Sequence, residues 1–331
     1  MALQTVGIIG GGAWGTALAM TARRAGRDAL IWAYEASTVE DINKLHVNRT
    51  FLPGIPLDPA IEATPHLNEV ASGDLLLLVT PSQAVRGIAS QLAQYVRSDR
   101  PLVICSKGFE QSTGKLLSEV VTEELPDASL AVLSGPSFAS EIARGLPAAV
   151  TLAAPDEDQG AALSRALSHA PFRCYWSEDM TGAQIGGAVK NVYAIAAGIV
   201  MGKQLGASAH AALVARGFAE MARLGAMFGA KRETLAGLSG LGDLVLTCGS
   251  PQSRNMSLGL ALGQGRSLAE ALKGRQSVTE GIYTAQALAE LAQSRGIEMP
   301  IASAVHAVVT ERATVDEAIE ALLSRPLRAE T

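Results

Sequence analysis

Near its N-terminus the chain reads Val6-Gly-Ile-Ile-Gly-Gly-Gly-Ala-Trp-Gly-Thr-Ala-Leu18, and the architecture we expect for the whole chain follows from it. The apolar run predicts a strand, and the residues after the glycines suit a helix. Between them, Gly10 permits a tight turn, Gly12 lets backbone approach a pyrophosphate, and Gly15 lets the helix pack against the strand. Because N–H groups at a helix start attract anions, the stretch predicts a dinucleotide-binding turn.

The sequence around these glycines strengthens that interpretation, since glycine triplets also occur in ordinary turns. A second strand is expected over residues 29–33, and it ends at Tyr34-Glu35. Glu35 stands 20 residues beyond Gly15, about where an acid that accepts from a ribose 2′-hydroxyl is expected. The N-terminal part therefore predicts a bound dinucleotide.

Length and composition narrow the class of protein. With 331 residues, 48% apolar and 18% charged, the chain suits two compact domains and not a disordered segment. A net charge of −5 gives no electrostatic reason to expect nucleic acid. The three cysteines are odd in number and widely spaced, which indicates free thiols in a reducing compartment. The five histidines form no ligand pair at helical spacing, so we expect no metal.

No targeting or membrane segment is expected. The first strand begins so near Met1 that a signal peptide has no room, and we expect a cytoplasmic protein. The apolar residues 185–201 contain Lys190, Asn191 and Tyr193, so we interpret them as a buried core helix and not a membrane span.

Strands and helices alternate up to about residue 177, and only helices are expected from residue 181 onward. Three turns follow strand ends, where open α/β sheets bind ligands: Thr80-Pro-Ser-Gln83, Ser106-Lys-Gly108 and Ser134-Gly-Pro-Ser-Phe-Ala139. We predict an α/β domain with a Rossmann-type doubly wound sheet over residues 1–186, and an all-α domain over residues 187–331. The boundary is placed near Gly186.

A few polar residues stand where a plain core would not place them. Lys190 lies in an otherwise small and apolar helix, where lost hydration would lower its pKa toward that of a general base, unless it reaches the surface. Lys107 follows a strand, and taken alone it is better explained as a surface lysine. A helix cap would adequately explain Asp243. Ser253-Arg-Asn255 suits a phosphate site or an ordinary helix start.

Taken together, nine motifs in one order resemble the NAD(P)-dependent glycerol-3-phosphate dehydrogenases. Along the chain they are Gly10-Gly-Gly-Ala-Trp-Gly-Thr-Ala-Leu18, Phe51-Leu-Pro-Gly54, Thr80-Pro-Ser-Gln83, Ser106-Lys-Gly108, Ser134-Gly-Pro-Ser-Phe-Ala139, Val189-Lys-Asn-Val192, Gly237-Leu-Ser-Gly-Leu-Gly-Asp-Leu244, Ser253-Arg-Asn255 and Val278-Thr-Glu-Gly281. The resemblance covers nearly the whole length. It implies a dehydrogenase that interconverts sn-glycerol 3-phosphate and dihydroxyacetone phosphate and supplies glycerol 3-phosphate for phospholipid synthesis.

The resemblance also implies roles for single residues. Lys190 would be the catalytic base, with Asp243 and Lys107 positioning the chemistry. The small phosphorylated substrate would be held by Lys107, Gly135, Ser137, Lys190, Asn191, Asp243, Thr247, Ser253, Arg254 and Asn255, with Arg254 on the phosphate. The cofactor would be contacted by Gly10, Gly12, Ala13, Trp14, Gly15, Tyr34, Glu35, Lys107, Ala139, Arg254, Val278 and Glu280. Relatives suggest a homodimer.

Two questions stay open at this point. Glu35 would repel a 2′-phosphate and favours NAD(H), while Arg49 on a nearby loop keeps NADP(H) possible. Ala13 replaces a serine common in the family, which should change little. A related 6-phosphogluconate or 3-hydroxyacid dehydrogenase would share the fold and the lysine but would not need the Ser253-Arg-Asn255 clamp. A non-catalytic dinucleotide sensor would have no use for a buried proton acceptor.

Overall fold

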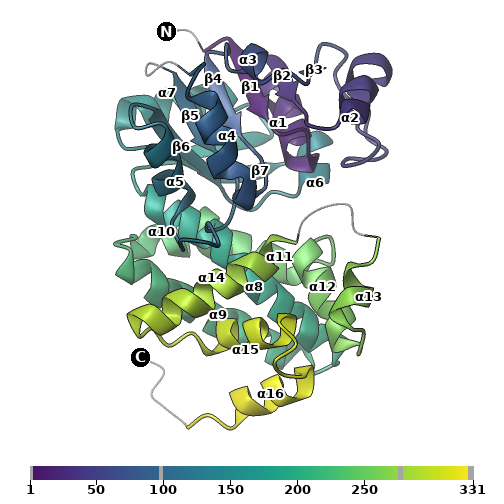
Figure 1. The fold of residues 1–331 in the computed structure, drawn as a ribbon, viewed down its shortest axis with the longest axis vertical. Coiled ribbons are helices and arrows are strands. Elements are labelled where there is room, and N and C mark those ends of the chain that lie inside the picture. Colours follow the sequence, from purple (N-terminus) through teal and green to yellow (C-terminus); the bar gives the residue numbers. More distant parts are fainter. Residues whose placement is uncertain (1–2, 97–99, 275–278, 327–331) are drawn as a thin grey trace.

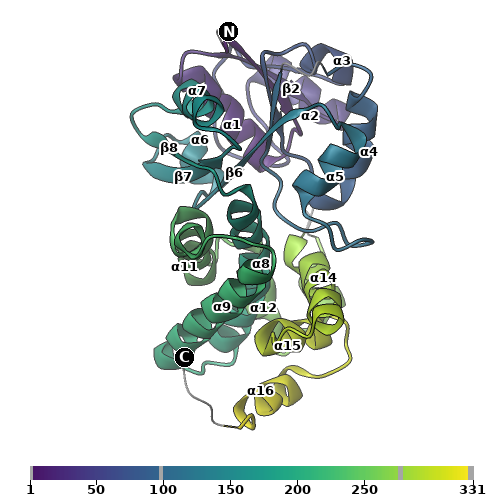
Figure 2. The same cartoon turned by 90° about the vertical axis from the view of Figure 1, so that its left-hand side faces the viewer.

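The structure, a computed structural model, describes residues 3–96, 100–274 and 279–326. Figure 1 shows two parts, one above the other: a sheet half up to Asp179 and a helical half from Met180 onward. Helix α8 (Met180–Gly202) starts at the junction and runs into the helical half, as the turned view in Figure 2 shows. The two expected parts, an α/β part followed by an all-helical part, are confirmed.

One eight-stranded sheet forms the sheet half, in the order β3-β2-β1-β4-β5-β6-β7-β8. Neighbouring strands are parallel, except that β6 and β7 are antiparallel. The strands are β1 (Thr5–Ile9), β2 (Asp28–Trp32), β3 (Glu62–Thr64), β4 (Leu75–Leu78), β5 (Pro101–Ile104), β6 (Ser129–Ser134), β7 (Ala148–Ala153) and β8 (Phe172–Ser177). The order reverses beside β1, which puts the glycine-rich stretch at the switch point.

Helices cover both faces of this sheet, which explains why β4 is apolar at every position. Leu75 and Leu77 pack in one core with α1 (Ala13–Arg24), α6 (Ala139–Ala143) and α7 (Glu157–Leu167). Leu76 and Leu78 pack in a second core with α3 (Leu67–Val70), α4 (Val85–Leu92) and α5 (Leu117–Glu124). A short 3₁₀ turn, η2 (Ser82–Ala84), precedes α4. The predicted doubly wound sheet is therefore confirmed.

The chain after β2 forms a short helix and a π-helical turn before it reaches an edge strand. The helix α2 (Ala36–Glu40) continues into a π-helical turn, η1 (Asp41–Leu45), and residues 62–64 form the edge strand β3. The Asn43 side-chain amide donates to the Ala63 carbonyl at 2.8 Å and accepts from the Ala63 N–H at 2.7 Å. Three residues without an apolar run give no strand signal, so this tertiary contact helps to place β3.

Within the described residues the helical half contains helices and no strand. They are α8, α9 (Ala207–Met227), α10 (Arg232–Ala236), the π-helical turn η3 (Leu238–Gly242), α11 (Asp243–Gly249), α12 (Arg254–Gly263), α13 (Leu268–Leu272), α14 (Glu280–Arg295), α15 (Pro300–Val309) and α16 (Val315–Leu323). Helix α8 is long and apolar enough to cross a membrane, yet 89% of its most apolar window is buried inside the protein. Helices α9, α10, α11, α12, α14 and α15 pack against it. Gly186, the expected domain boundary, lies within α8, and that boundary stays a prediction.

Candidate active site

The glycine turn, residues 10–15, links β1 to α1 at the carboxyl edge of the sheet. Gly10 has φ +132°, a conformation that side chains rarely adopt, and its N–H donates to the carbonyl of Trp32 at 3.0 Å. A Cβ on Gly15 would lie 1.9 Å from the Gly10 carbonyl oxygen, whereas one on Gly12 would meet nothing within 4 Å. The turn therefore packs tightly against β1 on one side and leaves open space at Gly12 on the other.

A second group of residues, the lysine cluster, consists of Lys107, Lys190, Asp243 and Thr247. Lys190 Nζ donates to Asp243 Oδ1 at 2.5 Å and to Thr247 Oγ1 at 3.0 Å. Lys107 Nζ donates to the other Asp243 oxygen at 2.7 Å and to the carbonyl of Gly135 at 3.1 Å. One carboxylate therefore holds two ammonium groups, so the cluster carries a net positive charge.

Burial decides how this cluster behaves. Asp243 is fully buried and Lys190 is 8% exposed. Burial lowers the pKa of Lys190 to about 8, because water no longer stabilises the ammonium; Asp243 opposes this shift and the charge of Lys107 adds to it. Lys190 is therefore not a surface lysine. Asp243 is not a helix cap either, because its carboxylate binds the two lysines and no backbone N–H group of α11.

Backbone packing brings the cluster together from distant parts of the chain. Lys107 follows β5 and Gly135 follows β6, so both lie at the carboxyl edge of the sheet. Lys190 lies on α8, and Asp243 begins α11 directly after η3. A Cβ on Gly186 would come within 2.3 Å of the Ser239 carbonyl oxygen, so this glycine lets η3 lie directly on α8, one helical turn before Lys190.

The start of α12 forms a third group beside α8. Ser253 caps the helix by accepting from the N–H of Met256 at 3.2 Å, as the sequence predicted for a helix start. Asn255 is buried; its amide donates to Asn191 on α8 at 3.0 Å and accepts from the N–H of Gly281 at 3.0 Å. Asn191 and Asn255 thus fix α8, α12 and α14 to one another. Arg254 is exposed on the first turn of α12.

Glu280, at the start of α14, joins the two halves. Its carboxylate accepts from the Ser82 N–H at 3.2 Å and from the Ser82 hydroxyl at 2.5 Å. Burial raises the pKa of Glu280 above its usual range, although the Ser82 hydrogen bonds and the charge of Arg254 oppose the shift. Ser82 belongs to the turn after β4, so Glu280 ties the helical half to the carboxyl edge of the sheet. Val278 lies outside the described residues.

The remaining predicted residues are spread along the same edge. Ala13 and Trp14 begin α1, and the buried indole N–H of Trp14 has no acceptor among the residues that the structure describes. Ala139 begins α6, which packs against α1, and the Ser137 hydroxyl donates to Gly135 at 3.0 Å. Tyr34 is 83% exposed and Glu35 precedes α2. No hydrogen bond between described residues links Tyr34 or Glu35 to the lysine cluster.

A family model described as NAD-dependent glycerol-3-phosphate dehydrogenase N-terminus matches residues 5–160, and the corresponding C-terminus model matches residues 179–320. The chain belongs to this family. A glycerol-3-phosphate dehydrogenase [NAD(P)+] of Parvibaculum lavamentivorans is 56% identical over 331 residues, covering 100% of this chain and 99% of the relative.

Solved structures of the family agree with this assignment. The glycerol-3-phosphate dehydrogenase of Coxiella burnetii is 40% identical, with a TM-score of 0.93 over 97% of this chain and 99% of that one. The glycerol-3-phosphate dehydrogenase of Saccharomyces cerevisiae is 27% identical, with a TM-score of 0.83 over 97% of this chain and 99% of that one. Both domains of the family are therefore present here.

Two residues of this region were missed by the sequence analysis. Ser82 lies in the quoted Thr80-Pro-Ser-Gln83 motif, whose place after an apolar strand was the available signal, but its partner Glu280 is 198 residues away. Asn48 lies on a loop and contacts the carbonyl of Gly11, which is 37 residues earlier in the chain. No local sequence pattern indicates this contact. Contacts of such long range leave no periodic pattern in a sequence.

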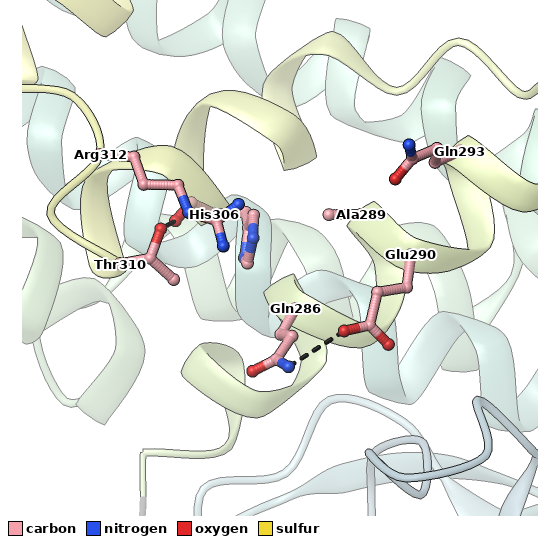
Figure 3. Close-up of a pocket in the computed structure, with 7 residues that line it drawn as sticks. All are labelled: Gln286, Ala289, Glu290, Gln293, His306, Thr310 and Arg312. Atoms are coloured by element: carbon pink, nitrogen blue, oxygen red, sulfur yellow. Dashed lines mark hydrogen bonds between the residues drawn. The ribbon is translucent and has the colours of Figure 1, made fainter.

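Two further cavities lie away from these residues. One, of about 370 Å³, is drawn in Figure 3 between α14 and α15, with Gln286 donating to Glu290 at 3.0 Å and with His306 and Arg312 on its other side. The other, of about 440 Å³, shares Gln286 and Glu290. Neither is lined by a predicted site residue. In the described part of the chain, no three His, Cys, Asp or Glu side chains gather in a way that could hold a metal.

Proposed function

We propose that this chain interconverts sn-glycerol 3-phosphate and dihydroxyacetone phosphate with NAD(H) or NADP(H). The observation that carries the proposal is the buried Lys190, which Asp243 and Thr247 hold by hydrogen bonds. Family membership supports the same reaction. An unphosphorylated 3-hydroxyacid substrate would not require an arginine at the start of α12.

The residues at the glycine turn fit a dinucleotide. The turn offers open space at Gly12 and the first N–H groups of α1, which suit a pyrophosphate. The Trp14 indole N–H, which has no acceptor among the described residues, could donate to a neighbouring group of the cofactor. Lys107, Ala139, Arg254 and Glu280 would complete the cofactor site from both halves. When bound, the nicotinamide supplies or accepts the hydride.

Lys190 would move the proton at the C2 oxygen of the substrate. In alcohol oxidation the neutral amine takes the hydroxyl proton, and in ketone reduction the ammonium returns it. A pKa of about 8 leaves both forms populated near neutral pH. Asp243 holds the amine in place, and Lys107 anchors the second carboxylate oxygen, so the carboxylate cannot turn away from Lys190.

The substrate phosphate would bind at the start of α12. Arg254 offers a charged guanidinium there, and the first N–H groups of the helix favour a dianion. Ser253 and Asn255 hold this end in place through the contacts described above. Gly135 and Ser137 would contact the glycerol end beside Lys107, since Lys107 already binds the Gly135 carbonyl.

Arg254→Ala tests the phosphate site. We expect the KM for dihydroxyacetone phosphate to rise roughly 10- to 100-fold, as for a lost hydrogen bond to a charged group. The KM for unphosphorylated dihydroxyacetone should hardly change. Arg216→Ala, which removes another exposed arginine of the helical half, is the matched control. Equal activity of the unchanged protein on both ketones would reject the proposed substrate.

The cofactor preference is proposed to be NAD(H). Glu35 precedes α2 at the end of the second strand, where its charge would repel a 2′-phosphate. Arg49 could attract one, but its guanidinium binds the carboxylate of Asp41, with Nε at 3.0 and 3.1 Å from the two oxygens. Initial rates with NADH and NADPH test this directly, and a higher kcat/KM for NADPH would contradict it.

A cytoplasmic homodimer that supplies glycerol 3-phosphate for phospholipid synthesis is proposed as the working form. Met201, Leu205 and Met227 are exposed near the two ends of α9 and could supply an apolar interface between the helical halves of two copies. Light scattering during size exclusion measures the mass. A mass that stays at one chain at micromolar concentration would contradict the dimer.

A further inference from the structure

The loop from His46 to Leu57 lies against the glycine turn and is itself well ordered by contacts. Its ends meet where the Leu57 N–H donates to the His46 carbonyl at 2.8 Å. Leu52, Ile55 and Leu57 are buried in the same core as α1 and β2. The loop is therefore anchored by apolar packing, and it can hold a side chain in a fixed position.

Asn48 is the side chain that this loop directs at the turn. It is 1% exposed, and its Nδ2 donates to the Gly11 carbonyl and to the Thr16 hydroxyl, each at 2.9 Å. The Thr16 hydroxyl in turn donates to the Gly12 carbonyl at 2.9 Å. On the other side, Asn48 Oδ1 accepts from the Phe51 N–H at 3.0 Å, so the amide is held from both ends.

These contacts fix the direction of two peptide groups. A trans peptide is planar, and its N–H points opposite to its carbonyl. Since the Gly11 carbonyl faces Asn48, the N–H of Gly12 points away from Asn48. Since the Gly12 carbonyl faces Thr16, the N–H of Ala13 points away from Thr16. No cis peptide bond occurs among the described residues.

We infer that Asn48 is a positioning residue for dinucleotide binding: it orients the Gly12 N–H group toward the pyrophosphate, and through Thr16 it supports the Ala13 N–H, which the helical bond from the Thr16 N–H to the Gly12 carbonyl already directs. The inference rests on the proposed binding of a nicotinamide dinucleotide at the glycine turn. The role is indirect, because Asn48 acts through the Gly11 carbonyl and through Thr16. Its loss frees the Gly11 peptide to rotate, so binding would have to order the turn again.

Two substitutions separate this role from simple support of the loop. Asn48→Ala removes every side-chain contact. Asn48→Asp keeps the acceptor for Phe51 but removes both donors, so the loop contact survives while the turn contact is lost. Asn43→Ala is the matched control, because Asn43 makes a similar pair of bonds from the same segment to Ala63 and none to the glycine turn.

The experiment measures the Kd of NADH by fluorescence, kcat at saturating NADH, and hydrogen exchange of residues 10–18 without cofactor. We expect both Asn48 variants to raise the Kd about tenfold, to keep kcat within about twofold, and to speed exchange in the turn, since tenfold in affinity is about 1.4 kcal/mol. Asn43→Ala should leave the Kd and the exchange of the turn unchanged.

Other outcomes overturn the inference. If Asn48→Asp binds NADH with a Kd within about twofold of that of the unchanged protein, Asn48 supports only the loop and does not position the turn. This conclusion holds even if the melting temperature of the variant changes. An equal rise in Kd for Asn43→Ala would mean that the whole segment acts and not this amide. If the unchanged protein does not bind NADH, the proposed function is wrong. That result differs from failure of the inference on Asn48, in which the unchanged protein binds NADH and the Asn48 variants bind it equally well.

Discussion

In the glycine turn the useful groups are backbone N–H groups of adjacent residues. In the lysine cluster they are side chains from distant parts of the chain, and the bonded pair Lys107 and Asp243 is 136 residues apart. The turn works by leaving space, because a Cβ at Gly12 would meet no protein atom within 4 Å. The cluster works by excluding water from Lys190 and Asp243. Binding of the dinucleotide thus depends on local backbone geometry, while the proposed proton transfer depends on tertiary burial.

The sharpest test of this difference is Lys190→Ala. We expect kcat to fall by about 10³-fold, within the range for loss of a general acid–base group, while the Kd of NADH stays within about threefold. Lys203→Ala, at the end of the same helix and paired with Asp316 on the surface, is the control. Near-normal turnover of Lys190→Ala across neutral and alkaline pH would remove the cluster from the mechanism.

Asp243→Asn should have the next largest effect. Removing the charge leaves the Lys107 and Lys190 ammonium groups without their shared carboxylate, and the pKa of Lys190 should fall further because Asp243 now raises it. We expect ketone reduction near neutral pH to drop about 10²-fold and its pH profile to move to lower pH. A drop in rate with an unmoved profile would show that Asp243 acts on structure alone.

Two glycine substitutions test whether Gly12 leaves space for the cofactor and whether Gly15 permits close packing of the turn. Gly12→Ala places its Cβ in open space at an allowed φ of −72°, so we expect an unchanged melting temperature and a Kd for NADH raised about tenfold, or about 1.4 kcal/mol. Gly15→Ala forces its Cβ against the Gly10 carbonyl and should lower stability by about 3 kcal/mol. Thermal unfolding and NADH titration of both variants distinguish the two effects; unaltered NADH binding by Gly12→Ala would contradict the proposed site.

The smallest expected effect is the pH dependence of the unchanged enzyme. With the pKa of Lys190 at about 8, the neutral amine needed for alcohol oxidation becomes more populated as pH rises through 8, and the ammonium needed for reduction declines. Oxidation should therefore speed up about threefold between pH 7.5 and 8.5, and reduction should slow by about the same factor. Rates in both directions at saturating cofactor measure it; the same slope in both directions would exclude Lys190 as the titrating group.

The sequence determined the features that depend on neighbouring residues. Local patterns in the sequence predict the alternating strands and helices, the change to helices alone after residue 177, the glycine turn and the helix start at Ser253. The structure contains each of these features. Lys190 could be singled out because a lysine in an apolar helix is unusual. The motifs also pointed to the family that the comparisons show.

Only the tertiary structure decided which distant groups meet. How η3 packs on α8 at Gly186 decides whether Lys190 lies in water or in the core. The same packing decides whether Lys190 and Lys107 share the Asp243 carboxylate. The contacts of Asn48 with Gly11 and of Glu280 with Ser82 join segments far apart in the chain. Burial and hydrogen bonding are properties of the packed chain, so local sequence patterns do not contain them.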